Sequence, residues 1–121
     1  MPTIKKKYPP IWHKELLKKS ARQEKDRLKT LKEVETALDE LEKKYHWDEA
    51  YIFGSLCGKK EFRQTSDVDI ALMGLNKFDL YALVGDISLR LNRQVDVVRM
   101  EECGFSKSII SRGIKWTKKK R

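Results

Sequence analysis

The chain has 121 residues and a formal net charge of +9, and 37% of its residues are charged. This length suits one domain and excludes a two-lobed enzyme cleft built within a single chain. No apolar run approaches the ~20 residues of a transmembrane helix, and no signal-peptide pattern is present, so we expect a cytoplasmic protein without a membrane partner.

The charge is distributed unevenly along the chain. Residues 1–32 carry eleven Lys or Arg and three acids, residues 33–105 carry nine and fifteen, and residues 106–121 carry seven and none. Basic ends around an acidic body differ from the uniformly basic surface that is typical of nucleic-acid binding. We therefore expect solvated basic ends, and nucleic acid is not expected as the main partner. Binding of DNA by the ends stays an alternative, which a steep salt dependence would support.

The first predicted element is a long helix from about Trp12 to Tyr45, a stretch that contains no Gly or Pro. Its second half is expected to pack on the core, and its first half to project or to contact another chain. One helical face is indicated by apolar residues at intervals of three and four, namely Leu28, Leu31, Val34, Leu38 and Leu41.

Short strands and helices alternate after this helix. "EAYIFGS" predicts a strand that ends at a glycine turn, "LCGKKEFRQTS" a short helix or loop, and "DVDIALMG" a second strand. "KFDLYALVGDISLRLNR" predicts a helix with one apolar face, and "QVDVVRM" a third strand. A last helix begins at Ser106 as its N-cap and ends at Gly113, before a short "IKW" segment. This order predicts an α/β fold, with a small mixed sheet of three or four strands flanked by helices.

Cysteine and histidine give no sign of a metal site. Cys57 and Cys103 are far apart in the sequence, and His13 and His46 are isolated. We expect two free thiols in a reducing compartment.

Two carboxylates interrupt the apolar run of the second predicted strand. Asp67 and Asp69 stand at positions i and i+2, so both side chains point to the same face. Burial without compensation would be costly, and a divalent cation such as Mg²⁺ would remove that cost. Asp96 stands in the third strand, and if the two strands pair, the three carboxylates converge and can hold two metal ions about 4 Å apart. The alternative, aspartates that cap strand ends or face solvent, stays open here.

Gly54 and Ser55 follow the first predicted strand directly. Glycine lets the backbone approach a ligand closely, and the serine hydroxyl and amide stand where anions bind well. A phosphate-binding turn beside a carboxylate cluster suits nucleoside triphosphate chemistry.

The stretch "GSLCGKKEFRQTSDVDIAL", followed by "VDVV", resembles the minimal nucleotidyltransferases of the DNA polymerase beta superfamily, including the MntA-type antitoxins of HEPN/MNT modules. The resemblance covers about residues 28–117. It implies that Gly54 and Ser55 hold the triphosphate, and that Asp67 and Asp69 ligate two Mg²⁺ ions. Asp96 would ligate the catalytic ion and help to activate the acceptor. The implied reaction transfers AMP from ATP to a hydroxyl, often a tyrosine of a HEPN toxin.

The sequence departs from the family pattern beside this motif. Leu56 and Cys57 stand where many members carry an arginine, and eleven residues separate Ser55 from Asp67. Lys59, Lys60 or Arg63 could supply the missing positive charge. Ser66, next to Asp67, is a further nucleotide-binding candidate. The closing segment often carries an acid where Arg112 or its neighbours lie.

The resemblance also suggests a division of the chain and a partner. We expect a basic, largely helical N-terminal extension (1–27), a nucleotidyltransferase domain (28–117) and a basic tail (118–121). The expected partner is a HEPN-domain toxin in a hetero-oligomer, and a homodimer is possible. Two other functions stay open: a small-molecule nucleotidyltransferase acting as a dimer, and a non-catalytic protein that neutralises the toxin by binding.

Overall fold

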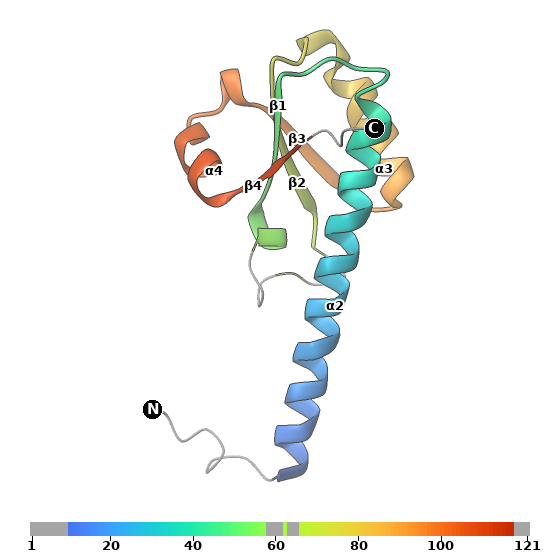
Figure 1. Cartoon of the computed structure of the whole chain (residues 1–121), viewed down its shortest axis with the longest axis vertical. Coiled ribbons are helices and arrows are strands. Elements are labelled where there is room, and N and C mark those ends of the chain that lie inside the picture. Colours follow the sequence, from blue (N-terminus) through green and yellow to red (C-terminus); the bar gives the residue numbers. More distant parts are fainter. Residues whose placement is uncertain (1–9, 58–61, 63–65, 118–121) are drawn as a thin grey trace.

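The structure, a computed structural model, describes residues 10–57, 62 and 66–117. A four-stranded sheet forms its centre, with helices on both faces (Figure 1). The elements in chain order are α2 (Pro10–Leu41), β1 (Glu49–Phe53), the 3-10 helix η1 (Gly54–Cys57), β2 (Val68–Met73), the 3-10 helix η2 (Lys77–Asp79), α3 (Leu80–Leu91), β3 (Val95–Arg99), the 3-10 helix η3 (Met100–Glu102), α4 (Ser106–Arg112) and β4 (Ile114–Trp116).

The sheet is mixed, in the order β3-β2-β1-β4. β1 pairs antiparallel with β2 and with β4, whereas β2 and β3 are parallel. A parallel pair needs a crossover connection, and η2 with α3 provides it. The predicted fold class is therefore confirmed, and the short "IKW" segment proves to be the fourth strand.

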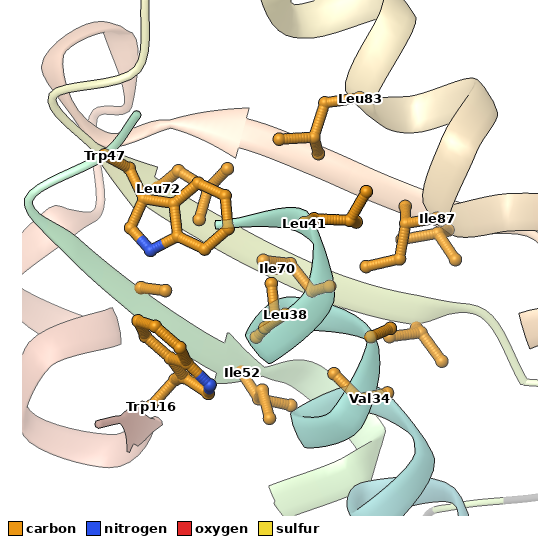
Figure 2. Packing of buried hydrophobic residues seen from close by; sticks show 14 of the residues in the cluster. Val34, Leu38, Leu41, Trp47, Ile52, Ile70, Leu72, Leu83, Ile87 and Trp116 are labelled. Carbon is orange, nitrogen blue, oxygen red and sulfur yellow. The ribbon is translucent and has the colours of Figure 1, made fainter. Parts of the chain in front are cut away.

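The larger core lies between the sheet and the helices α2 and α3 (Figure 2). Alternate residues of β1 and β2 face this layer, because successive side chains of a strand point to opposite faces. Trp47 and Trp116 meet edge to face with ring centroids 5.6 Å apart, and Trp116 Nε1 donates to Asp39 Oδ1 at 2.9 Å. This bond ties β4 to α2. The labelled residues of this core are Val34, Leu38, Leu41, Trp47, Ile52, Ile70, Leu72, Leu83, Ile87 and Trp116.

The apolar face predicted for α2 is correct except at its first position. Leu28 is 53% exposed, whereas Arg27, one residue earlier, is only 8% exposed. The reason is a polar contact, because Arg27 Nη1 donates to the Leu56 carbonyl oxygen at 2.8 Å. The buried stripe thus begins with an arginine stem and continues with Thr30 and Val34.

A second, smaller cluster covers the opposite face of the sheet. It joins Tyr51 of β1, Ala71 of β2, Met100 of η3 and Ile109 of α4. Asp69 and Asp96 belong to this face, since they stand one residue from the inward-facing positions of their strands. The face under α4 is therefore the one that carries the candidate chemistry.

Three further predictions have clear outcomes. α4 ends at Gly113 as expected, but Ser106 is its first helical residue, and the cap position falls on Phe105, which makes no capping side-chain bond. Neither Cys57 nor Cys103 forms a disulfide. Within the described ranges, none of the helices has the length and apolar character needed to cross a lipid bilayer.

Candidate functional site

Asp69 and Asp96 are neighbours in the sheet. In the parallel pair of β2 and β3, Asp69 stands in register with Asp96. In the antiparallel pair of β1 and β2, Asp69 stands in register with Phe53. Side chains in register on adjacent strands share one face, so Asp96, Asp69 and Phe53 form a row across three strands. The convergence expected for these two aspartates is therefore observed.

Asp67 precedes β2 and adds its charge to this row. The pKa of Asp69 is raised above its ordinary value, first by burial and then by the negative charges of Asp96 and Asp67. Asp67 and Asp96 are exposed, and Asp69 is half-buried between them. Three acidic side chains thus gather at the start of β2, where their like charges repel one another, an arrangement that favours a bound cation.

Gly54 closes the site from the side of β1. Its φ is +76°, in the region that favours glycine, and a Cβ atom there would lie 2.2 Å from Asp69 Oδ2. Any side chain here would be strained by the backbone angle and would displace the Asp69 carboxylate. The turn that begins η1 therefore lies directly against the central aspartate, as a ligand shared by the two would require.

A pocket of about 420 Å³ opens on the other side of this turn, between η1 and α4. Its volume is in the range of small-ligand sites. Phe53 and Phe105 meet there edge to face, with ring centroids 6.0 Å apart. The lining residues are Phe53, Gly54, Ser55, Cys57, Phe105, Ser108, Ile109, Arg112 and Gly113.

Long polar side chains contact Phe62 and Ser66, two described residues between the Gly54 turn and β2. Gln23 Nε2 donates to the Phe62 carbonyl at 3.0 Å, and Arg93 Nη1 donates to the Ser66 carbonyl at 2.8 Å. The guanidinium of Arg93 also lies 5.0 Å from the centroid of the Phe62 ring. The bond from Arg93 holds the backbone of Ser66 and thereby helps to position Asp67, the next residue. Ser66 itself is not among the described residues that line the pocket.

The donor set fits a hard divalent cation such as Mg²⁺. Carboxylate oxygens are the protein ligands that Mg²⁺ prefers. Because a bound Mg²⁺ ion keeps several of its water ligands, one or two carboxylates are enough to bind it. In the part of the chain that is described, no three Asp, Glu, His or Cys side chains stand close enough to form a complete metal site as they are.

The predicted site residues divide into three groups. Gly54, Ser55, Asp69 and Asp96 lie together, with Asp67 beside them. Ser66 lies next to them in the chain, held through its backbone. Lys59 and Arg63, like Lys60, lie outside the described residues.

Sequence reasoning missed the contribution of α4. Phe105, which caps α4, and Ser108 and Arg112 within it line the pocket beside Ser55, fifty or more residues away in the sequence. Their spacing of three and four along a helix was a signal for one shared face. Nothing in the sequence indicated that this face turns toward Gly54, because that depends on the pairing of β4 with β1.

Several solved structures share this fold. A chain of the crystal structure of a toxin–antitoxin with AMP-PNP aligns with a TM-score of 0.59 and 20% identity, covering 71% of this chain and 74% of that chain. A chain of the toxin–antitoxin MntA–HepT aligns with a TM-score of 0.50 and 19% identity, covering 70% of each chain. A mutant of MntA–HpeT, in which two aspartates separated by one residue are replaced by glutamate, aligns with a TM-score of 0.58, at 17% identity and coverage of 71% and 74%.

Curated protein sequences gave no match. The family described as "Polymerase beta, Nucleotidyltransferase" matches residues 35–121, which is most of the chain and includes the Gly54 turn and all three aspartates. The chain therefore belongs to the polymerase beta nucleotidyltransferase family.

Proposed function

We propose that this protein transfers AMP from ATP to a hydroxyl group of a partner protein, a tyrosine of a HEPN-domain toxin, and that it acts as the antitoxin. The observation that carries the proposal is the row of Asp69 and Asp96 packed against the Gly54 turn. Nucleotidyltransferases of this family generally use divalent metal ions and nucleoside triphosphates, and the carboxylates with their adjoining turn suit both.

Each residue has a role in this proposal. Asp67, Asp69 and Asp96 would hold Mg²⁺, which lowers the pKa of the acceptor hydroxyl and offsets charge at the α-phosphate when it is bound. Gly54 leaves room for the phosphates beside Asp69, and Ser55 offers its hydroxyl and amide to them.

The transfer is an in-line displacement at phosphorus. The acceptor oxygen forms a bond to the α-phosphorus, and the bond from that phosphorus to the bridging oxygen of the β-phosphate breaks. Pyrophosphate leaves with the electron pair. The hydroxyl proton passes to the carboxylate of Asp96, which is exposed and can face the acceptor.

The similar structures support a toxin as the partner. They are structures of toxin–antitoxin systems, and one of them contains AMP-PNP, an analogue of ATP. A second one carries glutamates in place of two aspartates spaced as Asp67 and Asp69 are here. Transfer of these properties to the present chain is our proposal, since the sequence identities are 20% and 17%.

We expect the gene adjacent to this one to encode a HEPN-domain protein, and the test uses the purified chain, labelled ATP, Mg²⁺ and the product of that adjacent gene. We expect an AMP adduct on a tyrosine of that protein by mass spectrometry, and no adduct with Asp67→Asn plus Asp69→Asn. Full transfer by the doubly substituted chain would show the assignment to be wrong. If this variant transfers no AMP but still relieves growth arrest by the toxin, the non-catalytic binding function is favoured instead.

A further inference from the structure

We infer that Arg112 of α4 binds the outer phosphates of the nucleotide, the part that leaves as pyrophosphate, in the pocket beside Gly54 and Ser55. This inference rests on the proposed function and names the cation of its nucleotide site. It also assigns the two sides of the Gly54 turn to different parts of the substrate. The aspartates of β2 and β3 serve the α-phosphate, and the pocket under α4 receives the rest of the triphosphate chain.

The pocket has the composition of an anion site with a single cation. Of the nine described residues that line it, Arg112 alone carries a charge. Ser55 and Ser108 add hydroxyl groups, and Phe53 and Ile109 form an apolar wall. Arg112 is exposed, and no ion pair engages it within the described part of the chain. Its guanidinium is therefore available, and it can bind two phosphate oxygens at once.

The electrostatics of the site require such a cation. A triphosphate brought next to Asp67, Asp69 and Asp96 adds negative charge to a place where burial and the charges of Asp96 and Asp67 already raise the pKa of Asp69. The segment after Ser55 gives no help among its described residues. Leu56 is fully buried, and the Cys57 thiol donates to the Ile52 carbonyl at 3.1 Å.

The backbone holds Arg112 close to the turn. Gly113 packs so tightly that a Cβ atom there would lie 2.6 Å from the Ile109 oxygen and 3.0 Å from the Ile52 oxygen. The Gly113 amide donates to the same Ile109 oxygen at 2.7 Å. The C-terminal end of α4 therefore packs tightly against β1 at Ile52, two residues before Gly54. This packing keeps the backbone of Arg112 near the Gly54 turn.

The experiment is isothermal titration of the full chain with ATP and, separately, with pyrophosphate, both with Mg²⁺. Arg112→Ala should weaken both ligands at least about tenfold, since a bidentate charged contact is lost. The affinity of Arg112→Lys for each ligand should lie between that of the unaltered chain and that of Arg112→Ala, because lysine keeps the charge but lacks the planar guanidinium. Lys107→Ala is the matched control. It removes an exposed cation from the same helix that does not line the pocket, and binding should not change.

The outcomes separate this inference from the proposed function. If the unaltered chain binds neither ligand, the nucleotide site itself is refuted. If it binds both, and Arg112→Ala binds them equally well, only the role of Arg112 is refuted. The same conclusion follows if binding is lost in Lys59→Ala or Arg63→Ala while Arg112→Ala keeps it. Melting temperatures of all variants guard against loss through misfolding, and those of the Arg112 and Lys107 variants should match the unaltered chain because both residues are exposed.

Discussion

Gly54 connects the backbone of the site to its chemistry, and its replacement is the sharpest single-residue test. Gly54→Ala would place a methyl group 2.2 Å from Asp69 Oδ2 at a φ of +76°. Either the turn or the aspartate must move, and a shift of about 1 Å in a reacting group can cost about 100-fold in rate. We expect AMP transfer to fall by about that factor, measured as product formed at saturating ATP.

Gly85→Ala is the control for this prediction. Gly85 lies within α3, and no atom stands within 4 Å of the position where its Cβ would be. Alanine favours a helix over glycine by about 0.5–1 kcal/mol, so this variant should be more stable in urea and equally active. Equal activity of the Gly54 and Gly85 variants would contradict the proposed place of the turn in the site.

Asp69 makes stability depend on pH in a definite direction. Its pKa is raised in the folded chain, so the folded state binds the proton more tightly than the unfolded state does. The associated stability is full below about pH 4 and is lost as the pH rises through the raised pKa. Asp69→Asn should therefore raise the melting temperature at pH 7 without metal, and the gain should shrink toward pH 3.

Asp86 provides a control of opposite sign. Its pKa is lowered, chiefly by the hydrogen bond from Lys44 and then by that from Tyr45. The stability that it contributes is present above about pH 4 and is lost as the pH falls through the lowered pKa. Asp86→Asn should thus lower the melting temperature at pH 7. A fall in melting temperature for Asp69→Asn as well as for Asp86→Asn at pH 7 would refute the electrostatic account of Asp69.

At the scale of elements, α2 is both a core helix and the support of the loop that carries the site. Arg27 Nη1 donates to the carbonyl of Leu56, the residue after Ser55. Arg27→Leu keeps an apolar stem but leaves this carbonyl without its donor, which costs about 1–3 kcal/mol. Leu28→Ala, at the exposed neighbouring position, should change the free energy of unfolding by less than about 0.5 kcal/mol.

Urea unfolding monitored by tryptophan fluorescence measures both variants. If Leu28→Ala proves the more costly of the two, the apolar face is the one the sequence suggested, and the burial of Arg27 has little energetic weight. The sequence could not reveal that Arg27 is buried in place of Leu28, because Leu28 fits the apolar spacing of three and four residues and a charged arginine does not. The burial of Arg27 depends on η1, which places the Leu56 carbonyl oxygen within reach of the Arg27 guanidinium.

For the molecule as a whole, the sequence predicted the strands and the aspartates on them better than it predicted the pocket between η1 and α4. Asp67 and Asp69 are two residues apart, so their common side is a consequence of strand geometry. Asp96 required the further condition that β2 and β3 pair, which the sequence left open and which their parallel pairing in the structure fulfils. The pocket under α4 could not be foreseen, because a three-residue strand decides where α4 packs.

The projecting part of α2 leads to a prediction about the whole chain. In Figure 1 the first half of α2 extends away from the sheet, and the described side chains from residue 17 to 22 are exposed. Contacts with the body begin at Gln23, which holds Phe62, and at Arg27, which holds Leu56. Since these are the first such contacts among the described side chains, we predict that the folded body begins a few residues before residue 27.

Two truncations separate these boundaries. A chain that lacks residues 1–20 should keep its free energy of unfolding within about 0.5 kcal/mol and bind ATP unchanged, since no described contact of the body is removed. A chain that lacks residues 1–30 loses the donors of Gln23 and Arg27 and the buried Thr30, and should be less stable by about 2–4 kcal/mol. Urea unfolding and ATP titration of both chains decide the matter. A large loss already in the shorter truncation would mean that the projecting helix belongs to the folded unit.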